Sequence, residues 1–276
     1  MNFHDIADNI EQREGVWYAK TQSSVSYPSD ATSIYFEIEE NSFWFKHRND
    51  CITTLVKNYS PKSVFFDIGG GNGFVSKGLQ NAGIEVVLVE PSALGVNNAF
   101  KRRHIKNVVC STLDDAHFKP ESIPAAGLFD VIEHIEDDTA FLHNLHRYIS
   151  PNGYLYTTVP TYQWLFSKFD TEAGHYRRYT KTSFDKLLAA AGFKLMYGTY
   201  IFRLLPLPIF LTRTLPSKIG AQKLFLNESV QKDQHGTKKG LLTQLANPLW
   251  QSELKNIELL KPMSFGGSYL AVAKKR

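Results

Sequence analysis

Short apolar runs alternate with amphipathic segments from about residue 50 to the end of the chain. The runs are rich in Val, Ile and aromatic residues and end at turn residues, as buried strands do. Between them, apolar residues recur at helical spacing and stop at glycines such as Gly83. We expect strands at residues 63–68, 84–91, 107–111, 123–131, 153–160, 193–202 and 267–275, and helices at 50–59, 74–83, 92–103, 137–149 and 182–192.

This alternation predicts an α/β fold, in which a mainly parallel sheet is covered by helices on both faces. Two regions lie outside it. We expect residues 1–48 to form an N-terminal cap segment and residues 203–264 to be an insertion that forms a substrate lid, because additions at the carboxyl edge of such a sheet commonly wall the site. Residues 49–202 and 265–276 then make up the main domain.

Composition narrows the class of protein. The chain has 276 residues, of which 43% are hydrophobic and 21% charged, as in ordinary globular proteins. Its net charge of +4 comes with short, scattered basic runs, so we expect no nucleic-acid partner. Cys51 and Cys110 cannot make a disulfide framework, and the acidic N-terminus does not resemble a signal peptide. These features predict a cytoplasmic protein.

The stretch "VFFDIGGGNGFV", residues 64–75, places four glycines directly after a strand. A dinucleotide-binding turn requires Gly or Ala at the sixth position, but that position is Phe74 when counted from Gly69 and Ser76 when counted from Gly71. No Gly-Lys-Ser/Thr triplet follows, which excludes a P-loop. Asp67 at the strand end would repel a phosphate and attract an ammonium group. The loop therefore favours a ligand that carries a positive charge.

A second acid, Glu90, ends the next strand, where an α/β sheet presents a carboxylate to ribose hydroxyls. The glycine turn, Asp67 and Glu90 together indicate S-adenosylmethionine rather than a nucleotide. Over residues 40–200 the chain resembles the class I S-adenosylmethionine-dependent methyltransferases, with "DIGGGNG", "VLVEP", "LFDVIEHIEDD" and "PNGYLYTTVP" in the family's order. It is similar to type 11, 12 and 23 methyltransferase domains and to quinone-pathway O-methyltransferases.

This resemblance implies a Rossmann-like sheet of seven strands with an antiparallel last hairpin. It also implies that Asp67 and the glycines hold the methionine part, that the strand end at Glu90 holds the ribose, and that Phe129 lies beside the sulfonium. Many members have Asp where this chain has Ser111, and Asp114 and Asp115 are nearby substitutes. The cofactor-binding candidates are Asp67, Gly69, Gly70, Gly71, Gly73, Glu90, Pro91, Ser111, Thr112, Leu113, Phe129 and Arg48.

The methyl acceptor is predicted to be a small molecule. Enzymes that methylate nucleic-acid amino groups carry an Asn/Asp-Pro-Pro-aromatic tetrad after the fourth family strand, and cytosine C5 enzymes require a Pro-Cys nucleophile. This chain has "FDVI" at residues 129–132, and neither cysteine follows a proline. By its similarity to the quinone-pathway enzymes, we expect transfer to a hydroxyl oxygen.

The catalytic candidates are Glu133, His134 and His175. An imidazole of near-neutral pKa can take a proton from a hydroxyl, so His134 is a candidate general base. Alternatively, Glu133 and His134 only begin a helix and brace the loop. No metal is assigned, although Asp130, Glu133 and His134 form an acid-x-x-acid-His cluster that could hold a divalent ion.

We expect aromatic and cationic residues outside the motifs to line the pocket for the methyl acceptor. Alternatively, these residues only cap helices and pack on the core. Arg48 would pair the cofactor carboxylate. A rival hypothesis is a lipid-linked or glycan acceptor, with "IFRLLPLPIFLTR" at residues 201–213 resting on a membrane surface. A second is a binding protein without turnover. The substrate-binding candidates are Trp44, Phe45, Trp164, Tyr176, Arg177 and Arg178.

Overall fold

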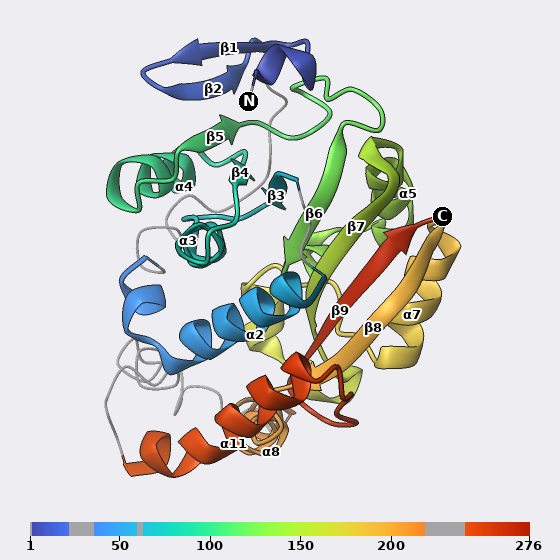
Figure 1. The fold of residues 1–276 in the computed structure, drawn as a ribbon. Coiled ribbons are helices and arrows are strands. Elements are labelled where there is room, and N and C mark those ends of the chain that lie inside the picture. Colours follow the sequence, from blue (N-terminus) through green and yellow to red (C-terminus); the bar gives the residue numbers. More distant parts are fainter. Residues whose placement is uncertain (1, 22–35, 60–62, 219–240) are drawn as a thin grey trace.

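A nine-stranded sheet forms the centre of the protein, in the order β1-β2-β5-β4-β3-β6-β7-β9-β8 (Figure 1). The computed structural model describes residues 2–21, 36–59, 63–218 and 241–276. The strands are β1 (Ile10–Arg13), β2 (Val16–Ala19), β3 (Phe65–Ile68), β4 (Val86–Val89), β5 (Asn107–Cys110), β6 (Ile123–Phe129), β7 (Ile149–Pro160), β8 (Phe193–Ile201) and β9 (Ser268–Lys275).

The predicted Rossmann-like arrangement is confirmed. Strands β3 to β7 pair in parallel, whereas β9 runs antiparallel to both β7 and β8. All seven expected strands are present, and β1 and β2 add a hairpin at the β5 edge, where Trp17 pairs with Val109. This hairpin, within the segment expected to be a cap, was not predicted, because four-residue strands carry little periodicity. The domain boundaries themselves stay a prediction.

Helices cover both faces of the sheet because successive strand residues point to opposite sides. On β3, Phe65 packs with Leu55 and Leu79 of the helices on one face, whereas Phe66 lies in the core shared with Leu145 and Leu188 on the other. The helices and helical turns are η1 (Phe3–Asp5), α2 (Phe43–Tyr59), α3 (Phe74–Asn81), α4 (Ala93–Asn97), η2 (Asn98–Arg102), η3 (Ile132–His134), α5 (Asp138–Tyr148), η4 (Gln163–Leu165), α6 (Lys168–Glu172) and α7 (Lys181–Ala190).

The described parts of the insertion between β8 and β9 are largely helical. It contains α8 (Pro206–Ile209), η5 (Phe210–Thr214), α9 (Leu215–Lys218) and α11 (Leu241–Glu258), and α11 packs beside α2 (Figure 1). None of the helices in the described part of the chain has both the length and the hydrophobicity needed to cross a bilayer.

One buried carboxylate joins α11 to the main domain. Glu253, only 1% exposed, accepts backbone hydrogen bonds from Phe202 (2.9 Å) and Arg203 (2.8 Å) at the end of β8. Its Oε2 also lies 2.9 Å from Nε2 of His47 on α2. Since an unpaired buried donor costs about 1–3 kcal/mol, this side chain stabilises the junction of three elements.

We predict that Glu253→Ala lowers the free energy of unfolding by at least about 2 kcal/mol, because it leaves buried donors without an acceptor. Glu258→Ala, in the same helix but with an exposed side chain, is the matched control and should change stability by less than about 0.5 kcal/mol. Urea titrations of both variants measure the difference. Equal effects would contradict the role of Glu253.

Candidate active site at the carboxyl edge of the sheet

The loop between β3 and α3 turns through three left-handed glycines. Gly69, Gly71 and Gly73 have φ values of 70°, 54° and 75°, which other residues rarely adopt. A Cβ on Gly70 would lie 2.4 Å from Cδ1 of Leu88, so the loop backbone packs directly on β4. At Gly71, by contrast, no atom of the described residues lies within 4 Å of the position that a Cβ would take. Gly71 therefore borders open space that a ligand can enter.

Two buried carboxyl groups flank the loop. Burial raises the pKa of Asp67 to about 6, even though Ser76 Oγ donates a 2.6 Å hydrogen bond to it. Glu90 accepts a hydrogen bond from the backbone N–H of Gly71 on Oε2 and from that of Ser92 on Oε1, both 2.8 Å. Burial also raises the pKa of Glu90. Each Glu90 oxygen keeps a lone pair for a further donor, such as a ribose hydroxyl.

A second group of titratable residues lies near the end of β6. A ligand atom from each of Glu133, His134 and His175 falls within 4.8 Å of the others, and the two imidazole centroids are 4.6 Å apart. The chain just before the cluster touches the glycine loop, since a Cβ on Gly69 would lie 3.0 Å from Cγ2 of Val131. The structure thus brings together the three residues predicted to be catalytic. The same three side chains are of types that could bind a metal ion.

Burial dominates the electrostatics of this cluster. Glu133 is fully buried, and within the described ranges neither carboxyl oxygen has a hydrogen-bond partner. Burial and the nearby Asp130 raise the pKa of Glu133 well above its usual range. Burial and the neighbouring His175 lower the pKa of His134 to about 4. Both groups therefore favour their uncharged forms.

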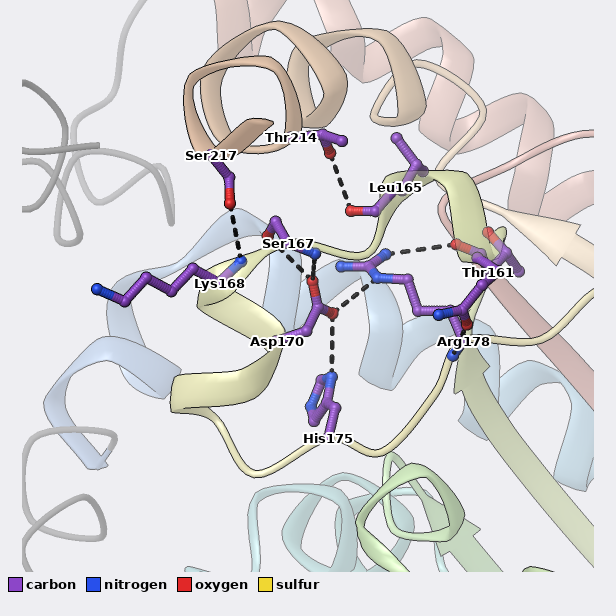
Figure 2. A network of polar contacts seen from close by, with 10 residues as sticks. Thr161, Leu165, Ser167, Lys168, Asp170, His175, Arg178, Thr214 and Ser217 are labelled. Atoms are coloured by element: carbon purple, nitrogen blue, oxygen red, sulfur yellow. Dashed lines mark hydrogen bonds and ion pairs between the residues drawn. The ribbon is translucent and has the colours of Figure 1, made fainter. Parts of the chain in front are cut away.

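Asp170 on α6 fixes the orientation of His175 (Figure 2). It accepts hydrogen bonds from Ser167 N (2.9 Å), Arg178 Nε (2.7 Å) and, at 3.2 Å, His175 Nδ1. Burial alone would raise the pKa of Asp170, but His175 and Arg178 hold it at about 2. Asp170 was not among the residues predicted from the sequence. The signal available was the Ser-x-x-Asp spacing from Ser167, which is typical of a helix start.

Comparison with known proteins identifies the family. A family model described as a methyltransferase domain, of type 23, matches residues 44–197, which is more than half of the chain. The chain belongs to this methyltransferase family. It is a class I S-adenosylmethionine-dependent methyltransferase, as the order of its motifs predicts.

Individual relatives are more distant. The mitochondrial ubiquinone biosynthesis O-methyltransferase of Schizosaccharomyces pombe is 30% identical over 117 residues, which are 39% of this chain and 42% of that protein. The chain therefore matches less than half the length of that curated relative.

Solved structures share the fold. Phosphoethanolamine N-methyltransferase 2 of Haemonchus contortus, with S-adenosyl-L-methionine, has a TM-score of 0.54 at 18% identity, over 94% of this chain and 61% of that one. A methyltransferase from Archaeoglobus fulgidus gives 0.52 at 18% identity, over 87% of this chain and 99% of that one.

The glycine loop of the methyltransferase fits the cofactor. The open space at Gly71 admits a ligand, and the acids at Asp67 and Glu90 suit its ammonium group and ribose. The adenine assignment stays a prediction. Ser111 Oγ donates to Thr112 O at 2.8 Å, while Asp114, a predicted substitute, accepts from Asn144 and Tyr148 of α5.

Arg48 lies on α2 at the same edge of the sheet, where it forms an ion pair with Asp130. Its guanidinium carbon is 5.0 Å and 5.6 Å from the ring centroids of Trp44 and Phe45. Asp130 also accepts a 3.0 Å hydrogen bond from Thr158. Arg48 is therefore held against β6, and its contact with the cofactor carboxylate stays a prediction.

Of the other residues predicted to bind the methyl acceptor, two form ion pairs within the protein and two have exposed side chains. Arg178 binds Asp170, and Arg177 pairs with Asp138 at 2.7 Å, as the alternative role predicts. Trp164 and Tyr176 are 47% and 52% exposed and remain available to an acceptor. Two cofactor-binding candidates remain. Phe129 was expected beside the sulfonium, and its ring lies in the core, 6.3 Å from the Phe65 ring. Pro91 follows Glu90 and precedes α4.

We predict that cofactor affinity falls as the pH drops through about 6, because protonation of Asp67 would remove the charge that we expect to face the cofactor's ammonium group. Between about pH 7.5 and pH 5 the loss should approach tenfold, given one proton uptake. Since the folded-state pKa lies above the ordinary 3.8, ionisation of Asp67 lowers the free energy of unfolding as the pH rises from about 4 to about 6. Calorimetry on wild type and Asp67→Asn tests this. A similar pH dependence in Asp67→Asn would contradict the assignment.

Gly71→Ala and Gly83→Ala form a matched pair, since both glycines are left-handed and neither has a described atom within 4 Å of a Cβ. Each substitution should cost about 1–2 kcal/mol of stability through backbone strain. Only Gly71→Ala should weaken S-adenosylmethionine binding, by at least about tenfold, because its methyl group enters the cofactor space. Parallel thermal melts and calorimetry measure both effects. Unchanged affinity in Gly71→Ala would show that the open space is not the cofactor site.

Proposed function

We propose that this methyltransferase transfers a methyl group to a hydroxyl oxygen of a small molecule. The observation that supports it is the cluster of Glu133, His134 and His175 that follows the end of β6, where an acceptor hydroxyl would meet imidazoles able to take its proton. The ubiquinone-pathway relative, an O-methyltransferase by name, is consistent with this acceptor class. That relative is mitochondrial, so a cytoplasmic location stays a prediction.

When bound, the cofactor supplies an electrophilic methyl group on a sulfonium. The protein's part is to align the acceptor oxygen and remove its proton. His134, with its pKa lowered to about 4, is neutral at physiological pH but stabilises an added proton poorly. His175 is oriented for this role, because its Nδ1–H donates to the Asp170 carboxylate at 3.2 Å, which leaves the Nε2 lone pair to take the proton. We therefore assign His175 as the group that finally holds the proton. His134 is its partner, next to the hydroxyl that receives the methyl group.

We predict that His175→Ala and His134→Ala each lower kcat by about 10²–10⁴-fold, while affinity for S-adenosylmethionine barely changes. His143→Ala, on the exposed side of α5, is the control and should keep wild-type kcat. The measurement is methyl transfer to a panel of phenols and catechols, alongside calorimetry with the cofactor. Near-normal kcat in both histidine variants would rule out the base assignment.

Two other outcomes identify the alternative roles. If the histidines only brace the loop, their substitution should reduce stability, cofactor binding and turnover together. If Glu133, His134 and His175 hold a metal ion, a chelator should abolish wild-type activity, and Mg²⁺ or Mn²⁺ should restore it. Melting temperature, cofactor affinity and kcat, each with and without chelator, separate these cases.

A second candidate acceptor is a lipid-linked molecule presented at a membrane surface. The observation that favours it is the exposure of apolar side chains on the helical insertion, among them Leu207 at 64% and Leu211 at 52%. The insertion also contacts the segment that carries His175, because Thr214 Oγ1 donates a 2.9 Å hydrogen bond to Leu165 O.

A further inference from the structure

Four leucines are exposed in the first helix of the insertion and in the turn that leads into it. Leu204, Leu207, Leu211 and Leu215 are 48%, 64%, 52% and 39% exposed, and residues 206–218 form one unbroken helical stretch from α8 through η5 to α9. Intervals of four residues place Leu207, Leu211 and Leu215 along one side of this helix, and Leu204 lies in the turn before it. We call these four residues the leucine face.

The apolar surface continues beyond the leucine face. Leu249 of α11 is 38% exposed and Phe265 is 45% exposed. These two residues, together with Leu204 and Met263, line a hollow of about 400 Å³ next to the helix. Monomeric proteins rarely leave clustered large apolar side chains in water unless the surface binds something.

Basic side chains outnumber acidic ones around the leucine face, where the exposed acid on the adjoining α6, Glu172, pairs with Lys168 at 3.7 Å. Arg203, Arg213 and Lys218 lie in or beside the helix, and the sequence has no Asp or Glu between Asp185 and Glu228. A protein partner of mixed charge would match Arg203, Arg213 and Lys218 poorly, whereas anionic lipid headgroups complement all three. The helical stretch is too short to span a bilayer, so the geometry is that of a helix lying in the interface.

We propose that the leucine face docks this methyltransferase on an anionic lipid surface. The leucines insert among the acyl chains near the headgroups, and Arg203 and Lys218 remain at headgroup level. Docking itself does not depend on the proposed O-methylation. Only the further step, in which the acceptor is drawn from the lipid phase, rests on it.

The same helix contacts the acceptor side of the site (Figure 2). Thr214 Oγ1 donates to Leu165 O, and the backbone N–H of Lys168, two residues before Asp170, donates to Ser217 Oγ at 3.2 Å. The Trp164 ring is 5.7 Å from that of Phe210. A lipid-carried acceptor entering beside the leucine face would therefore reach the segment that carries His175.

Co-sedimentation with vesicles tests the proposal on the full chain. We expect wild type to bind vesicles of phosphatidylcholine with phosphatidylglycerol, to bind pure phosphatidylcholine at least about tenfold more weakly, and to lose affinity as salt rises. The double variant Leu207→Ser/Leu211→Ser should bind anionic vesicles at least about tenfold more weakly for each leucine replaced. This expectation follows from the free energy gained when a leucine side chain is removed from water. Arg203→Gln/Lys218→Gln should remove the preference for anionic vesicles.

Leu94→Ser on α4 is the matched control, because Leu94 is also exposed, at 37%, but lies outside the insertion. It should bind vesicles like wild type. All variants should keep wild-type melting temperature and cofactor affinity, so a loss of lipid binding cannot come from misfolding or from failure of the cofactor site.

Three results would overturn the proposal. The first is that wild type stays in the supernatant with anionic vesicles. The second is that the leucine variant and wild type bind vesicles equally. The third is that wild type is a dimer in sedimentation velocity, the leucine variant is a monomer, and neither binds vesicles. The last result would assign the leucine face to contact between two copies of the chain.

Discussion

Two backbone hydrogen bonds to Glu90 hold the cofactor side of this methyltransferase in place. They join the loop after β3, through Gly71, to the beginning of α4, through Ser92. Because β3 and β4 are neighbouring parallel strands, their carboxyl ends meet at one edge, and a carboxylate on one can reach the loop of the other. A buried carboxylate is costly unless it is hydrogen-bonded, so folding of the loop and satisfaction of Glu90 favour each other.

The titratable groups of the site differ in protonation state between the glycine loop and the cluster of Glu133, His134 and His175. On the cofactor side, Asp67 has a pKa of about 6 and is ionised at neutral pH, as a cationic ligand requires. On the acceptor side, burial favours protonated Glu133 and neutral His134. In the proposed reaction these neutral groups would leave the acceptor hydroxyl without a competing cation, while the Asp170 carboxylate holds the His175 ring through Nδ1. The charged carboxyl group is thus at the glycine loop, and the uncharged groups are in the cluster after β6.

The sequence predicted what depends on local pattern. Strand ends followed by acids at Asp67 and Glu90 could be read directly, because the topology of an α/β sheet fixes where such ends lie. Pairings between distant segments could not be read. Arg48 was assigned to the cofactor, but its ion pair with Asp130 depends on how α2 packs on β6.

The role of Arg178 was also hidden in the sequence. Its guanidinium binds Asp170, and neither the composition nor the spacing of "HYRRYT" tells a donor to substrate from a brace. The β1–β2 hairpin was missed for a similar reason, since its strands are too short for a period of two to stand out against chance. In each case the missing information is tertiary.

The contacts of Glu90 and those of Asp170 share no residue, so the two sides of the site can respond independently. Glu90 ties the glycine loop to β4, whereas Asp170 ties His175 to a segment that also bonds to the insertion helix at Leu165 and Lys168. A small displacement of that helix would change the position of His175 through Asp170 before it changed the cofactor loop. If His175 takes the proton as proposed, the insertion is placed to adjust proton removal separately from cofactor binding. Such a separation would suit the proposed enzyme, whose cofactor is soluble and whose acceptor would arrive from a lipid surface.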